Sequence, residues 1–63
     1  MAEVSIGQVW QNIDNADKVI VRDVTHKIVV AQNLVEDSMF FDTILHFIAN
    51  YKLVRDNYLV AKA

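Results

Sequence analysis

The sequence has no cysteine and no proline, and its single glycine is Gly7. Without cysteine, the chain has neither disulfide bonds nor thiolate metal sites, and it lacks the crosslinks that stabilise many very small domains. Without proline and with one glycine, no segment has the composition of a flexible linker. The sequence therefore predicts one small domain over residues 1–63.

Clusters of basic residues and long apolar runs are also missing. No two Lys or Arg residues are adjacent and the net charge is −2, whereas nucleic-acid-binding surfaces normally gather Lys and Arg. No run approaches the ~20 apolar residues of a membrane-spanning helix, and the N-terminus has no cationic region before an apolar stretch. These absences argue against nucleic acid and membranes as partners, and we expect a cytoplasmic protein.

The chain is instead rich in apolar side chains. Hydrophobic residues make up 54% of it, with ten valines and six isoleucines. A chain this short buries only roughly 60% of its unfolded surface on folding alone. Because much apolar surface would stay exposed in a monomer, we expect a homo-oligomer.

The local patterns predict two helices and two hairpins. A capping box of Ser5 and Gln8 predicts a first helix over residues 5–13, with one face formed by Ile6, Val9, Trp10 and Ile13. Dense Val and Ile predict strands at residues 18–23 and 27–32, joined by a loop of about four residues. A second helix is expected from residue 38 to 51, capped by Asp37 or Ser38. Its apolar face consists of Phe40, Ile44, Phe47, Ile48 and Tyr51. Residues 52–61 predict a second hairpin around Asp56 and Asn57.

The predicted fold class is therefore α+β, with the order αββαββ. Two short helices would pack on one face of a largely antiparallel sheet. Residues 3–31 and 36–61 also form a quasi-repeat with six identities at an offset of 33, including Val-Arg-Asp at 21–23 and 54–56. Both internal duplication and chance remain open as explanations of the quasi-repeat. Because Val-Arg-Asp recurs at the ends of two expected strands, we favour a geometric role for it over a ligand site.

The first hairpin is apolar on both of its faces, and strands of that kind require cover on both sides. Since two helices cover only one face, the other face is predicted to be an oligomer interface. Its candidate residues are Val19, Val21, Val29 and Val30, with Tyr58 from the last strand.

Three cations, Arg22, Lys27 and Arg55, are candidates for a polar contact surface if the two hairpins lie side by side. They support the alternative function of a nucleic-acid-binding accessory or regulatory factor. Asp23 and Asp56 would lie among them and cancel most of their field, so cross-strand ion pairs are the simpler expectation.

No catalytic, cofactor or metal site is predicted. Asp42 and His46 are four residues apart, a spacing that suits either a surface ion pair or a carboxylate that orients an imidazole base. We expect the ion pair, because no nucleophile accompanies them. His26 and His46 lack the spacing of metal ligands, and His26 is expected at the bend of the first hairpin.

The acidic turn at residues 14–17, followed by Lys-Val-Ile-Val-Arg-Asp, resembles small uncharacterised proteins of phages and prophages of Gram-positive bacteria. The resemblance extends to Tyr-Lys-Leu-Val at 51–54 and Leu-Val at 59–60. Those proteins commonly have Gly or Asn in the first hairpin turn, where this chain has Val-Thr-His. The resemblance implies a phage-encoded accessory protein that binds a host or phage protein. We therefore expect a non-enzymatic, oligomeric protein-interaction module.

Overall fold

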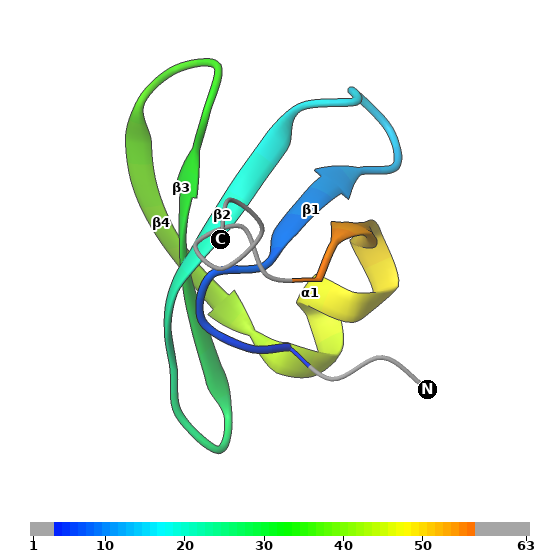
Figure 1. The fold of residues 1–63 in the computed structure, drawn as a ribbon. Coiled ribbons are helices and arrows are strands. Elements are labelled where there is room, and N and C mark those ends of the chain that lie inside the picture. The colour runs from blue at the N-terminus through cyan, green and yellow to red at the C-terminus, as the bar shows by residue number, and fades with distance from the viewer. Residues whose placement is uncertain (1–3, 57–63) are drawn as a thin grey trace.

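In the computed structural model, which describes residues 4–56, the chain forms a five-stranded antiparallel sheet and one short helix (Figure 1). The elements follow the order β1 (Val9–Asn12), β2 (Lys18–Val24), β3 (Ile28–Asn33), β4 (Ser38–Thr43), α1 (Ile44–Asn50) and β5 (Tyr51–Arg55). The strands are arranged as β4-β3-β2-β1-β5, so β4 and β5 are the two outer strands.

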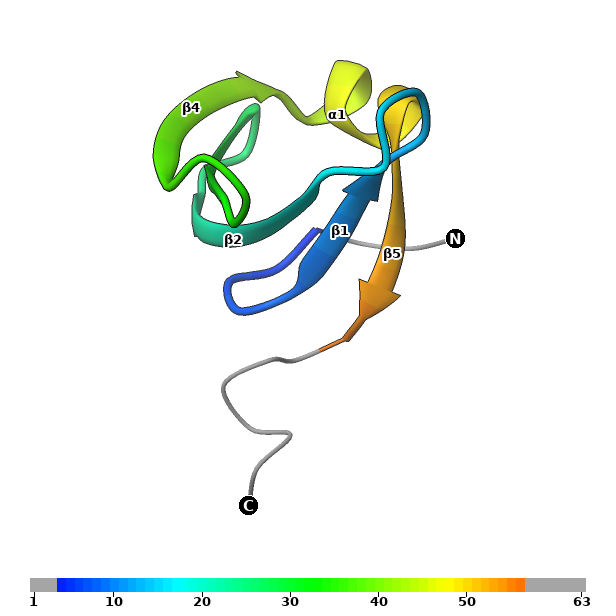
Figure 2. The same ribbon diagram turned by 90° about the horizontal axis from the view of Figure 1, so that it is seen from above.

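The sheet is curled, and α1 joins its two outer strands. The pairing register shifts between Val21 and Asp23 of β2 and between Val9 and Trp10 of β1. Such bulges bend a strand and increase its twist. Figure 2 shows the curved strands, with α1 between the end of β4 and the start of β5. The helix contacts β3, β4 and β5, which places it over the hollow side of the sheet.

The core lies between that side of the sheet and α1. Its buried members are Trp10, Val19, Val21, Val29, Ala31 and Phe47. The Phe47 ring meets Trp10 edge-on at a centroid distance of 5.3 Å and stacks on Tyr51 at 4.4 Å. Aromatic contacts of these geometries add to the stabilisation from buried area. A single side chain of α1 therefore connects the helix to both β1 and β5.

The αββαββ order with two helices on one sheet face is wrong, because both predicted helices contain strands. In the first, the Gln8 side chain does reach back to the Ser5 amide, at 2.7 Å, as in a capping box. However, Gly7 has a φ of 92°, which is outside the helical region. Its N–H donates to the carbonyl of Val21, so the chain turns and joins β2 as a strand.

The second predicted helix divides into β4 and α1 at Thr43. The Thr43 side chain accepts a hydrogen bond from the amide of His46 and forms the N-cap, five or six residues later than predicted. Phe40 and Tyr51 still pack against the core, but from strands on either side of the helix. Apolar side chains from β4, α1 and β5 therefore have the sequence spacing that is typical of the apolar face of one helix.

The first hairpin is confirmed as β2 and β3, and the acidic turn at 14–17 is confirmed as a turn. Of the expected hairpin at residues 52–61, the first strand corresponds to β5. The residues from 57 onward lie outside the described range. Within the quasi-repeat, Ala16 lies in a turn with a φ of 66°, whereas its counterpart Ala49 lies in α1. The described parts of the two segments therefore have different structures.

Candidate functional site

Three of the predicted interface residues lie in the core. Val19, Val21 and Val29 are at most 1% exposed, so they have no surface to offer a partner. The second face of the first hairpin was expected to need another subunit, but Ile20 on that face is also buried within this chain. Of the remaining candidates, Val30 is partly exposed and Tyr58 lies outside the described residues.

An apolar patch lies instead on the outer face of β3 and β4. Val29 and Ala31 are buried, so Val30 between them points to the opposite face of the sheet. Phe41 is paired with Val30 across the two strands and is 75% exposed. Met39, two residues earlier on the same face, is 56% exposed. We call Val30, Met39 and Phe41 the outer patch.

Polar side chains border the outer patch. Gln32 pairs with Met39, and Asp23 of β2 pairs with Val30. The guanidinium group of Arg22 donates from Nε and Nη2 to Gln32 Oε1, at 3.0 and 2.6 Å. The arrangement is an exposed aromatic side chain among apolar neighbours with a polar rim, which is the usual anatomy of a protein contact surface.

The outer patch was missed because β4 was assigned to a helix. The signal that could have found it is the alternation within residues 38–43. There the inward Phe40 stands between the outward Met39 and Phe41 with a period of two. Four of the six residues of β4 are exposed, which is typical of a strand at the edge of a sheet.

The three candidate cations do not form one cluster. Arg22 lies in β2, Lys27 in the turn before β3, and Arg55 at the far end of β5 beside Val9. Arg22 is held by Gln32 rather than by a carboxylate. The ion pair of His46 with Asp42 involves none of these cations, and the cross-strand ion pair expected at Arg22 is not seen among residues 4–56.

Asp42 and His46 are in contact, but they do not share a helix. His46 Nδ1 lies 2.6 Å from Asp42 Oδ2, across the junction of β4 and α1. The other carboxylate oxygen of Asp42 accepts the amide of Thr43 at 2.8 Å. The pair thus fixes the start of the helix, which is a structural role.

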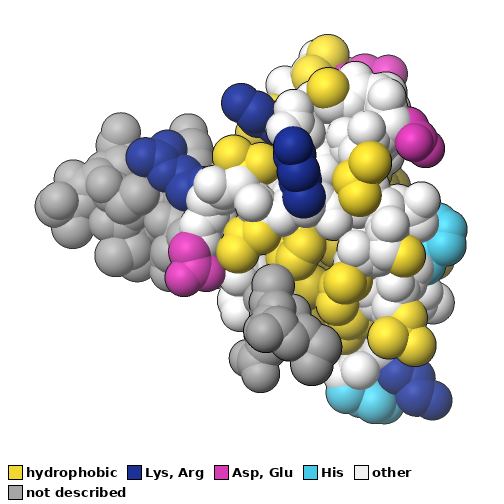
Figure 3. All heavy atoms as spheres, turned by 90° about the vertical axis from the view of Figure 1, so that its right-hand side faces the viewer, with side chains coloured by type: hydrophobic (Ala, Val, Ile, Leu, Met, Phe, Trp, Pro, Cys, Tyr) yellow, Lys and Arg dark blue, Asp and Glu magenta, His cyan; other side chains and the backbone are white. Residues whose placement is uncertain are grey.

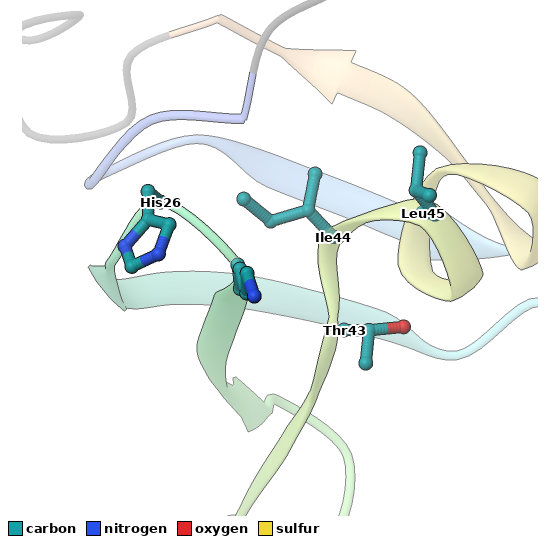
Figure 4. A pocket seen from close by; sticks show the side chains of 5 residues that line it. His26, Thr43, Ile44 and Leu45 are labelled. Carbon is teal, nitrogen blue, oxygen red and sulfur yellow. The ribbon is translucent and has the colours of Figure 1, made fainter.

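A shallow hollow of about 420 Å³ lies between the turn before β3 and the start of α1 (Figure 4). Its lining residues are His26, Lys27, Thr43, Ile44 and Leu45. The surface seen from the α1 side also shows hydrophobic side chains among scattered charges (Figure 3). Leu45 of α1, at 83% exposed, is the most accessible large apolar residue among those described.

Residues 4–56 contain neither a cluster of metal-binding side chains nor a membrane-spanning helix. No group of three or more His, Cys, Asp or Glu side chains in this range is arranged to hold a metal ion. No helix in the same range has the length and apolar character needed to cross a membrane.

No protein-family model, curated protein or solved structure matches this chain. The surface of the molecule is therefore the feature that indicates its function.

Proposed function

We propose that the protein is a non-enzymatic protein-interaction module that binds another protein through the outer patch. The observation that carries the proposal is Phe41, a large aromatic side chain that is three-quarters exposed in the middle of a regular strand. Leaving a Phe ring in water forgoes a large hydrophobic gain, and aromatic residues with apolar neighbours are frequent anchors of protein contacts.

The resemblance to phage proteins suggests the class of partner. A phage protein or a host protein in the cytoplasm is the partner we propose. We also propose homo-oligomerisation, which the small apolar chain led us to expect, as an association separate from the binding of another protein. Because Val19, Val21 and Val29 are buried, it requires a surface other than the one first predicted.

The polar groups that could suggest an enzyme have structural uses. Within the described residues, Asp42 is the one hydrogen-bond partner of the His46 ring, and the Thr43 hydroxyl group caps α1. These contacts support a structural assignment of all three residues and thus a non-enzymatic module.

Site-specific photo-crosslinking tests the proposal. A photoreactive phenylalanine analogue placed at position 41 should capture one protein other than this chain in the native host cell, and purified unlabelled protein should compete for that capture. The Phe41→Thr variant should compete poorly, whereas Leu45→Gln should compete fully, because Leu45 is even more accessible than Phe41 but lies outside the outer patch. Equal competition by both variants, or capture of nothing but this chain itself, would contradict the proposal.

A further inference from the structure

The free edge of β4 offers backbone groups to another strand. In an antiparallel ladder, hydrogen-bonded residues alternate along each strand. The Ile44 amide donates to the carbonyl of Lys27, and this pair continues the β3–β4 register. This alternation means that the backbone N–H and C=O groups of Ser38, Phe40 and Asp42 form hydrogen bonds with β3. The N–H and C=O groups of Met39, Phe41 and Thr43 therefore point to the opposite edge.

Only part of that edge is available. The Thr43 amide is already bound by the carboxylate of Asp42, at 2.8 Å. Within residues 4–56, the amides of Met39 and Phe41 have no hydrogen-bond partner. The open segment is therefore three residues long and is centred on Phe40.

Several of the usual protections of a strand edge are missing from β4. Edge strands commonly carry Lys, Pro or a bulge that prevents pairing with other chains. The segment Ser-Met-Phe-Phe-Asp-Thr has no Lys and no Pro, and its register with β3 is continuous. In contrast, the other outer strand, β5, contains Lys52 and Arg55, and its register with β1 is interrupted.

We propose that β4 pairs antiparallel with β4 of a second copy of this chain, with the two Phe40 residues opposite each other on the two-fold axis. Met39 then lies opposite Phe41 of the second copy, and these residues exchange four backbone hydrogen bonds. The one charge in the strand, Asp42, lies opposite the hydroxyl of Ser38 and not opposite its own copy. A register centred on Phe41 is disfavoured, because it would require the Thr43 amide that Asp42 already holds.

This pairing uses the backbone edge of β4 and is independent of whether the outer patch binds a different protein. The two outer patches lie on the same face of the combined sheet and become neighbours across the axis. A dimer would therefore present a continuous apolar surface of twice the size. The shared contact is one short strand, so we expect a reversible dimer.

Cysteine crosslinking tests both the pairing and its register, because the chain has no cysteine of its own. Residues directly opposite in a hydrogen-bonded pair have Cα atoms ~5.5 Å apart, which suits a disulfide, whereas diagonal residues are too distant. A mixture of Met39→Cys and Phe41→Cys should form disulfide-linked dimers at several times the yield of either variant alone. Dimers mainly from Phe41→Cys alone, or equal yields with the exposed control Leu45→Cys, would overturn the proposal.

Amide hydrogen exchange of the unmodified protein gives a second readout. As concentration rises, exchange at Met39 and Phe41 should slow severalfold. The Thr43 amide, which is held by Asp42, should change little. Concentration-independent exchange at Met39 and Phe41 would overturn the pairing. Capture of a different protein at position 41 would still support the proposed function.

Discussion

The buried side chain of Gln8 joins parts of the chain that are distant in sequence. Its Oε1 atom accepts hydrogen bonds from the Ser5 amide and from Trp10 Nε1, and its Nε2 donates to Asp56 at 3.0 Å. Trp10 is 2% exposed, so its indole N–H would find no water if this acceptor were removed.

We predict that Gln8→Ala lowers the free energy of unfolding by about 1–3 kcal/mol, because a buried donor is left unsatisfied. Gln11→Ala is the matched control, since the bond from its Nε2 to the Ala16 carbonyl is exposed, and it should cost less than about 0.5 kcal/mol. Urea unfolding measures both. Equal losses would show that the Gln8 network contributes nothing specific.

The backbone of Ala16 is strained. Its φ of 66° lies in the left-handed region, which costs a non-glycine residue roughly 1–2 kcal/mol. Ala16→Gly should therefore raise the free energy of unfolding by about 0.5 kcal/mol, after the entropic cost of glycine is subtracted. Its quasi-repeat counterpart Ala49 lies in α1, so Ala49→Gly should lower the free energy by about 1 kcal/mol. Thermal unfolding that gives the same sign for both would contradict these backbone assignments.

Individual residues also show why the first helix was predicted wrongly. Ser5 and Gln8 form the side-chain contact of a capping box, but Gly7 leaves the helical region and donates to β2. The sequence indicates the local hydrogen bond between Ser5 and Gln8. It does not indicate that the Gly7 amide binds the carbonyl of Val21, which is distant in sequence. Val9 and Trp10 are buried on opposite faces of a strand, whereas Ile6 and Ile13 are exposed.

Helix α1 has seven residues, too few to be stable by itself, and it depends on packing. Phe47 is fully buried between Trp10 and Tyr51, while Leu45 on the same helix is exposed. We predict that Phe47→Ala costs about 3–5 kcal/mol. That loss is comparable to the roughly 3–9 kcal/mol expected for a domain of this length.

Leu45→Ala, in contrast, should change the free energy of unfolding by less than about 0.5 kcal/mol. Circular dichroism during urea titration distinguishes the two variants: Phe47→Ala should be largely unfolded before denaturant is added. A folded Phe47→Ala variant with near-normal stability would contradict the role of this ring as the attachment of α1.

Of the elements, β2 and β3 were predictable because their density of β-branched residues marks strands regardless of context. The boundary between β4 and α1 was not. Phe40, Phe47 and Tyr51 all face one core from different elements, and a spacing of three or four residues does not reveal that a strand ends at Thr43. The outer patch was missed through the same error, because residues 38–43, which include Phe41, were assigned to a helix.

At the scale of the whole molecule, Val19, Val21 and Val29 are buried because the sheet curls and α1 lies on its hollow side. The prediction of a second subunit over those valines failed because it assumed a flat sheet with two faces to cover. Part of the apolar surface that remains lies at the edge, where Met39 and Phe41 of β4 are exposed. The cations are dispersed over β2, the following turn and β5.

This dispersion leads to a prediction about nucleic acids. The protein should not shift DNA or RNA in gel electrophoresis at physiological salt, and any retention at low salt should disappear steeply as salt is added. Arg22→Gln and Lys27→Gln should leave the result unchanged. Tight, sequence-selective binding at physiological salt would favour the alternative of a nucleic-acid-binding factor.

The most direct test of the claim that β4 is the contact strand is the molar mass in solution as a function of concentration. Light scattering on the unmodified protein and on Leu45→Gln should show a rise from 7.2 kDa toward twice that value. Phe41→Thr should show a smaller rise over the same range, because it keeps the backbone hydrogen bonds of a strand-forming residue but loses the contact of its ring with Met39 of the second copy. A mass of 7.2 kDa for the unmodified protein at every concentration, or an undiminished rise for Phe41→Thr, would contradict the account.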